Sequence, residues 1–164
     1  MLRHSPPTPK SKPRRGAAAV ELAMVLPLFM TLTFVSMEMG HALNVVQKLE
    51  STVRDGGRIA AKDIPPALLG GGITSNQKVA NDIKNMLRAE GYPATNIVVT
   101  IVHADGATAG LTFDLSNSAN QYKLMLITVT IPYNDVKMFP LSITPSTLLS
   151  ASLVVSRGRS TMNL

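Results

Sequence analysis

The chain contains no cysteine and no tryptophan, and only 4% of its 164 residues are aromatic. Without cysteine it can form neither a disulfide framework nor a thiolate metal site. With so few aromatic side chains, any soluble core must be aliphatic and modest in size. A secreted domain of this composition therefore has to be held together by its aliphatic core or by its partners.

Acidic residues are missing from the first 16 positions, which carry five of the 16 basic residues of the chain: Arg3, Lys10, Lys12, Arg14 and Arg15. The other eleven basic residues face ten acidic ones, so the rest of the chain carries only +1 of the net charge of +6. A basic tail directly before an apolar run is typical of a membrane-topology signal. We therefore expect no nucleic-acid partner, although the overall charge alone would suit one.

Charge is also absent from residues 22–37, which read LAMVLPLFMTLTFVSM. As a helix they would be about 24 Å long, and residues 17–20 supply the turn needed to cross a hydrocarbon core of about 30 Å. We predict a transmembrane helix over 17–41, with Glu21 and Glu38 near its inner and outer boundaries. Pro27 is tolerable because membrane helices accommodate proline when neighbours satisfy the freed carbonyl.

The basic flank predicts the direction of the span. By the positive-inside rule the N-terminus lies in the cytosol and the C-terminal part outside. Two alternatives remain open: a buried helix of a soluble domain, and a cleaved signal peptide ending at Gly40-His41-Ala42, which would leave a secreted chain beginning at Leu43.

Residues 14–21, Arg-Arg-Gly-Ala-Ala-Ala-Val-Glu, resemble a type IV prepilin cleavage site. The resemblance implies a cut between Gly16 and Ala17 by a membrane peptidase, after which Glu21 is the fifth residue. A carboxylate at a membrane boundary costs a few kcal/mol unless it is paired. Ala17 and Glu21 lie four residues apart, on one helix face. The resemblance implies that the new Ala17 ammonium pairs with Glu21 of a neighbouring subunit. Glu21 simply reaching the interface is the alternative.

Three further segments resemble TadE-like proteins in order and spacing: Ala19–Leu28, Met37–Gly40 and Thr52–Ala61. Together with the cleavage motif they cover roughly residues 14–62. The sequence departs from the family at Leu22, where an aromatic residue is usual, and at Gly57, where alanine is usual. A mature chain beginning with Ala17 instead of phenylalanine favours the Tad branch, and the length is similar to that of TadE or TadF proteins.

The resemblance implies a minor pilin-like subunit, or pseudopilin, that acts in assembly of a Tad/Flp-type type IVb pilus and sits in the bacterial inner membrane. Its implied partners are the prepilin peptidase, TadF-like and TadG-like subunits, the Flp-type major pilin and the inner-membrane assembly platform. Whether the subunit enters the fibre stays open. The alternative is a signal-anchored or secreted periplasmic binding domain unrelated to pili.

Beyond the span the pattern predicts an α+β fold: the long N-terminal membrane-spanning helix followed by a small domain with one or more helices and an antiparallel sheet. The helix continues on one apolar side and stops at residues 63–66, where two prolines occur. We expect a Gly-rich hinge at 69–72, a helix from a Ser75 cap to about Glu90, and strands at 96–104, 122–133 and 149–156. The predicted segments are a leader at 1–16, the span at 17–41, a helix extension at 42–64, a linker at 65–75 and a domain at 76–164.

Catalytic motifs are missing. The histidines (His4, His41 and His103) are scattered and lack metal-ligand spacing, and the late carboxylates Asp114 and Asp135 have no partner in the sequence. We read the methionines as apolar filler and His103 as structural or exposed. The sequence thus predicts no catalytic residue, no metal and no cofactor, which is the expectation for a protein that is not an enzyme.

Overall fold

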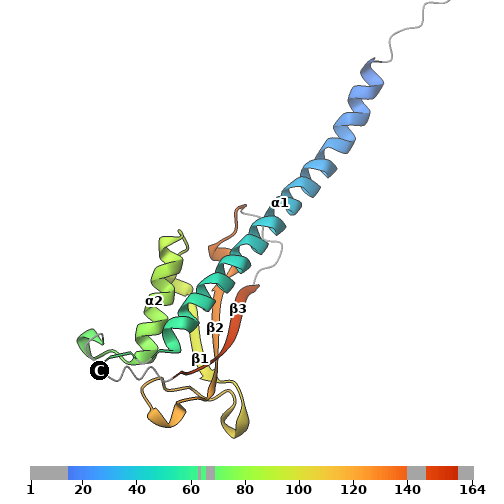
Figure 1. The fold of residues 1–164 in the computed structure, drawn as a ribbon. Coiled ribbons are helices and arrows are strands. Elements are labelled where there is room, and N and C mark those ends of the chain that lie inside the picture. Colours follow the sequence, from blue (N-terminus) through green and yellow to red (C-terminus); the bar gives the residue numbers. More distant parts are fainter. Residues whose placement is uncertain (1–14, 63, 66–68, 140–146, 159–164) are drawn as a thin grey trace, which may run out of the picture. The chain divides into compact units, whose positions relative to one another are not determined.

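A computed structural model describes residues 15–62, 64–65, 69–139 and 147–158 (Figure 1). The contacts divide the chain into two compact units, Met1–Met37 and Glu38–Leu164. Most of the predicted leader, together with Asp63 and Pro66 of the predicted helix stop, lies outside the described residues. The fold is α+β, as predicted, with a long apolar helix before a small domain that contains a second helix and a three-stranded antiparallel sheet.

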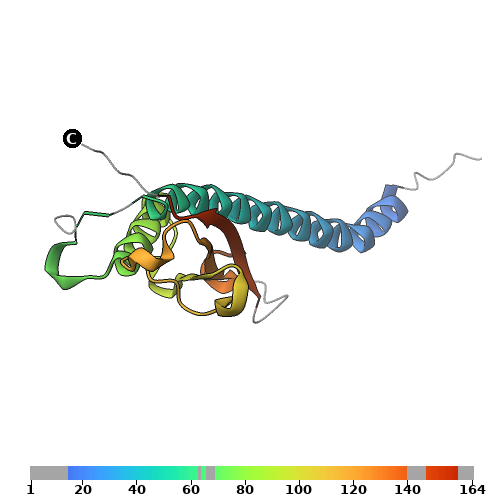
Figure 2. The same cartoon turned by 60° about the horizontal axis from the view of Figure 1, so that its bottom comes forward.

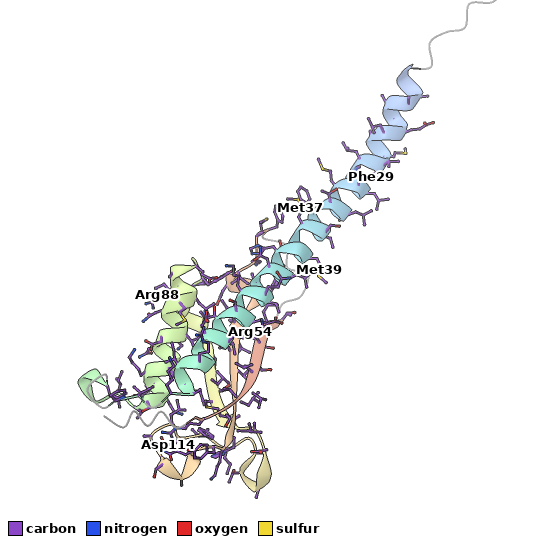
Figure 3. The ribbon with its side chains drawn as sticks, in the orientation of Figure 1. Phe29, Met37, Met39, Arg54, Arg88 and Asp114 are labelled. Carbon is purple, nitrogen blue, oxygen red and sulfur yellow. The ribbon has the colours of Figure 1, made fainter. Side chains whose placement is uncertain are left out.

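The first unit consists of the N-terminal part of helix α1 (Arg15–Ala60). Every described side chain of this unit is exposed, including those of Phe29 and Met37 (Figure 3). Its hydroxyl groups donate to carbonyls four residues earlier, from Thr31 to Pro27 at 2.6 Å and from Ser36 to Leu32 at 2.8 Å. An apolar surface whose polar groups are satisfied internally is what a helix needs inside a bilayer. By length and composition α1 can cross a membrane.

The second part of α1, from Glu38 onward, has one buried side. Val45, Leu49 and Val53 are fully buried, and they recur at helical spacing as predicted. Of the other predicted positions, Val46 and Ile59 are half-buried. This part of α1 is therefore a core element of the second unit. The helix ends at Ala60, before the predicted stop at residues 63–66.

Helix α2 (Ser75–Ala89) begins one residue earlier than the sequence interpretation assumed. Thr74, not Ser75, is the N-cap: its hydroxyl accepts from the backbone N–H of Gln77, and the Gln77 side chain accepts from the N–H of Thr74. The prediction of a Ser75 cap was wrong because this reciprocal arrangement needs a threonine or serine three residues before a glutamine or glutamate.

In the preceding turn η2 (Gly70–Gly72), Gly71 and Gly72 have φ values of +69° and +76°, which glycine adopts without strain.

The sheet has the order β1-β2-β3, with β1 (Val98–His103), β2 (Leu124–Pro132) and β3 (Leu148–Ser156) paired antiparallel. The three strands lie within or close to the predicted ranges, as expected from their alternating patterns. Side chains of β2 alternate strictly, with Met125, Ile127, Val129 and Ile131 buried. Helices α1 and α2 lie on the face of the sheet to which these residues point, and no α-helix of the described residues lies on the opposite face (Figures 1 and 2).

The core is aliphatic, as the composition predicted. Of its largest fully buried side chains only Phe113 is aromatic. His103, predicted to be structural or exposed, is 8% exposed, and its ring stacks at a tilt on Phe113 with centroids 4.7 Å apart. His103 thus belongs to the core.

Two adjacent glycines let helix α2 and strand β3 pack closely against α1. A Cβ atom on Gly56 would lie 2.5 Å from the Ile83 side chain of α2, and one on Gly57 would lie 2.7 Å from Cδ2 of Leu153 in β3. Both distances are shorter than carbon atoms tolerate. Gly56 and Gly57 therefore allow α1 to approach the second helix and the sheet closely.

Candidate functional site

The predicted cleavage position lies in the first turn of α1. Gly16 and Ala17 are both exposed, and a Cβ added to Gly16 would meet nothing within 4 Å. Within the described residues, then, no packing contact explains a glycine at this position, whereas Gly56 and Gly57 have one. The first turn of a helix is also the part that frays most easily, so the bond between Gly16 and Ala17 is open to another molecule.

Glu21 follows one turn later and is exposed. In the part of the chain that the structure describes, no ion pair or hydrogen bond joins its carboxylate to another side chain. Ala17 and Glu21 are both in α1 at a spacing of four residues, which places them on one side of the helix. Any charged partner of Glu21 would therefore come from outside the described part of the chain.

Glu38, in contrast, is buried, with 5% of its surface exposed. Its carboxylate accepts a hydrogen bond from the hydroxyl of Tyr133. It also accepts from the backbone N–H groups of Met138 at 3.2 Å and Phe139 at 3.1 Å. A buried carboxylate is tolerated when its oxygens have donors of this kind. These bonds attach α1 to the segment that follows β2.

His41, one turn along α1, strengthens the same attachment. Its Nε2 lies 2.6 Å from the carbonyl oxygen of Val136. Because a carbonyl can only accept, Nε2 is the nitrogen that carries the proton. Glu38 and His41 together contact four positions of residues 133–139, the segment we call the β2 exit loop.

Tyr133 is affected by this environment. Burial, and secondly its hydrogen bond to Glu38, raise the pKa of the Tyr133 hydroxyl to about 12. The neutral phenol that donates to Glu38 is therefore the stable form over the whole physiological range. The hydrogen bond between Tyr133 and Glu38 is therefore a fixed structural contact.

Sequence reasoning missed this cluster. It took Glu38 as a residue at the outer membrane boundary and Tyr133 as the end of a strand. The signal that was available is an acid directly after an apolar run, within the Met37–Gly40 segment of the family resemblance. Nothing local identified the donors, because Tyr133, Met138 and Phe139 lie 95, 100 and 101 residues away.

The remaining polar clusters stabilise loops. The side chain of Asn76 donates to the carbonyl of Phe113 at 2.6 Å and accepts from the N–H of Leu115 at 2.9 Å. The hydroxyl of Ser116, and then its backbone N–H, lower the pKa of Asp114 by donating to its carboxylate. Asp135, which seemed unpartnered in the sequence, accepts from Asn96 at 2.9 Å.

The described residues form no metal centre. None of their His, Asp and Glu side chains form a group that could hold a metal ion. A hollow of about 310 Å³ between α2 and β1 is lined by amides, threonines and aliphatic side chains, with no acid, base or histidine: Asn76, Gln77, Ala80, Val99, Thr100, Ile101, Val102 and Thr112. Such a lining supplies no general acid or base.

A family model described as TadE-like protein matches residues 16–58. The match begins at Gly16, contains Glu21, Glu38 and both packed glycines, and ends two residues before α1 does. It confirms the resemblance found in the sequence over these 43 of the 164 residues, and the matched family consists of pilin-like proteins associated with Tad pili. No curated protein and no solved structure matches the chain. The single apolar helix is compatible with a single-pass membrane anchor.

Proposed function

We propose that this protein is a minor pilin-like subunit that acts in assembly of a Tad/Flp-type type IVb pilus. A prepilin peptidase would cut it after Gly16, and the mature chain would stay in the bacterial inner membrane with its C-terminal domain in the periplasm. Its action would be physical and not catalytic. The observation that carries this proposal is Gly16, whose added Cβ would meet nothing within 4 Å among the described residues, at the start of the family match and of an exposed apolar helix.

The surroundings of Glu21 support the assembly role, because its carboxylate has no side-chain partner among the described residues. A boundary carboxylate that stays without a partner is costly in a membrane. Cleavage would create an ammonium group at Ala17, and Glu21 of one subunit could pair with Ala17 of the next. A buried pair of this kind contributes more to register between subunits than to stability.

The exposed surface of the first unit supports the same role. Side chains such as Leu22, Leu28 and Phe29 are each more than 60% exposed, so they are free to pack against lipid or against the helices of related subunits. TadF-like and TadG-like subunits, the Flp-type major pilin and the assembly platform are the proposed partners. The second unit would then present its surface in the periplasm beside them.

The N-terminal residue of the mature protein tests the proposal. We expect intact mass analysis, on protein from a strain with its own peptidases, to give a chain that starts at Ala17. Gly16→Leu should leave the chain uncut. Gly40→Leu is the matched control, because Gly40 also lies in α1 with nothing within 4 Å of an added Cβ, and it should be cut normally.

Other mature ends would favour other functions. A chain that starts at Met1 in both variants and in the unchanged protein would contradict pilin-type processing and favour a signal-anchored binding domain. A chain that starts at Leu43 would indicate a secreted protein without an anchor.

A further inference from the structure

One whole face of the sheet is uncovered in the described structure. We call it the outer face; it consists of the side chains that point away from α1 and α2, three from β1, five from β2 and five from β3. None of these thirteen side chains is buried: Val98, Thr100, Val102, Leu124, Leu126, Thr128, Thr130, Pro132, Leu148, Ser150, Ser152, Val154 and Ser156. Val98, Leu148 and Val154 are more than half exposed.

The outer face carries no charge. Seven of its side chains are aliphatic or proline and six are hydroxyls, and no Asp, Glu, Lys or Arg occurs anywhere in the three strands. The helices on the other side differ: Arg54 of α1 and Arg88 of α2 are exposed (Figure 3). A solvated sheet face normally carries charged side chains, and depletion of charge is what distinguishes the core of an interface from other surface.

The composition suits pairing of the face with itself. A two-fold contact brings identical surfaces together, so any charge near the axis would meet its own copy. Across the middle of the sheet, Thr128 lies between Thr100 and Ser152. These three hydroxyls would meet the same row of a second copy without repulsion, and aliphatic side chains lie on both sides of the row.

Sheet geometry allows this pairing. When two sheets pack face to face with a two-fold axis along β2, their strands stay nearly aligned, which is a common geometry for packed sheets. The helices that cover the other face of each sheet then remain on the outside of the pair (Figures 1 and 2).

The area of the outer face limits the strength of a contact between two copies. Strands about 4.8 Å apart with a rise of about 3.3 Å per residue give the outer face about 400 Å² in plan. Two copies would bury on the order of 1,000 Å², at the lower limit for a specific interface. Such a dimer is weak in dilute solution, but anchoring both chains in one membrane raises their effective concentration.

We infer that the outer face is the contact surface between two copies of this chain in the membrane, packed sheet against sheet about a two-fold axis near Thr128. The inference goes beyond the proposed function, because it concerns neither cleavage at Gly16 nor the pairing of Glu21. Its test uses purified full-length protein in vesicles, without a peptidase or other subunits, so the two proposals can fail separately.

Thiol cross-linking tests the contact, since the chain has no cysteine of its own. We expect Thr128→Cys to give covalent dimers with a short bismaleimide, whose span suits the ~10 Å between packed sheets. Arg88→Cys on α2 is the matched control for random collisions and should give few. Equal yields from the two variants, or none from Thr128→Cys at any protein-to-lipid ratio, would overturn the inference.

Charge substitution sharpens the test. Thr128→Glu and Thr128→Lys should each lower the dimer fraction about tenfold or more, because like charges would face each other across the axis. Mixing the two variants should restore dimers, measured by energy transfer between labels on the two chains. Unchanged circular dichroism controls for folding. A mixture that does not form dimers again would contradict the inference. A cross-link in native membranes that captures a different protein and no second copy would show that another partner covers the face.

Discussion

The two parts of helix α1 differ in composition and in burial. Residues 15–37 contain two charged side chains and residues 38–60 contain six, in stretches of equal length. Yet the described side chains of the apolar part are all exposed, whereas the more polar part buries Val45, Leu49 and Val53. The first part needs an apolar solvent around it, and the second needs one apolar side against its own domain.

The two carboxylates of the helix show the same difference. Glu21 has no side-chain partner within the described residues, while Glu38 receives three hydrogen bonds from the β2 exit loop. One carboxylate is therefore available to another molecule, and the other is used within the chain. Charge content alone therefore does not determine which part of a helix is buried. The spacing of its apolar residues does.

The largest expected effect comes from truncating matched leucines in the two parts. Leu49→Ala should lower the free energy of unfolding of the second unit by about 2–5 kcal/mol, because it leaves a cavity beneath α1. Leu32→Ala removes the same atoms from a side chain that is 57% exposed and should leave this unfolding unchanged. Urea unfolding of the full chain in detergent, followed by circular dichroism, measures both. Equal losses would mean that both parts of the helix pack into one core.

The next effect comes from the two carboxylates. Glu38→Ala leaves a buried hydroxyl and two backbone N–H groups without an acceptor, and should cost about 2–3 kcal/mol of unfolding free energy. Glu21→Ala should cost none, and should instead reduce pilus assembly in cells. A Glu21→Ala variant that unfolds as easily as Glu38→Ala would contradict the different uses assigned to the two residues.

A smaller effect, of opposite sign in the two cases, is expected at two glycines. Gly40→Ala should stabilise the protein by up to about 1 kcal/mol, because alanine is the better helix former and nothing lies near its Cβ. Gly56→Ala should destabilise it by about 1–2 kcal/mol, because overpacking against buried Ile83 exceeds that gain. Thermal unfolding of both variants measures the signs, and stabilisation by Gly56→Ala would show that α2 can move away.

The smallest expected effect near neutral pH is a change in stability with pH through ionisation of Tyr133. Its folded pKa of about 12 lies above the ordinary value of 10.0, so its contribution to stability is fully present below pH 10 and is lost as the pH rises from about 10 to 12. Absorbance of ionised tyrosine, compared between the protein and Tyr133→Phe, follows this step. In Glu38→Ala the step should move only part of the way towards pH 10, because burial is the larger cause of the shift.

Local patterns sufficed to predict the elements. The strands follow from alternating apolar residues, and the buried side of α1 follows from its helical spacing. The N-cap was misplaced although the Thr74 to Gln77 spacing was visible in the sequence. His103 could also have been assigned to the core, because it lies two residues from Ile101 and thus on the same strand face.

The candidate site was less predictable, for a physical reason. Gly16, Ala17 and Glu21 form a motif that depends on adjacent residues, so a sequence displays it directly. The role of Glu38 depends on donors that lie 95 to 101 residues away in the sequence. The roles of Gly56 and Gly57 likewise depend on Ile83 and Leu153, whose positions follow only from the packed domain.

The distance in sequence between Glu38 and its donors also imposes an order of events. In a chain that crosses the membrane after its anchor, Glu38 and the apolar side of α1 emerge first. The donors at Tyr133, Met138 and Phe139, and then strand β3, emerge last. Contacts so far apart form late and slowly, and exposed apolar surface invites association in the meantime. In such a chain the part of α1 that begins at Glu38 would therefore stay uncovered longest, and a chaperone or a neighbouring subunit could bind it during that interval.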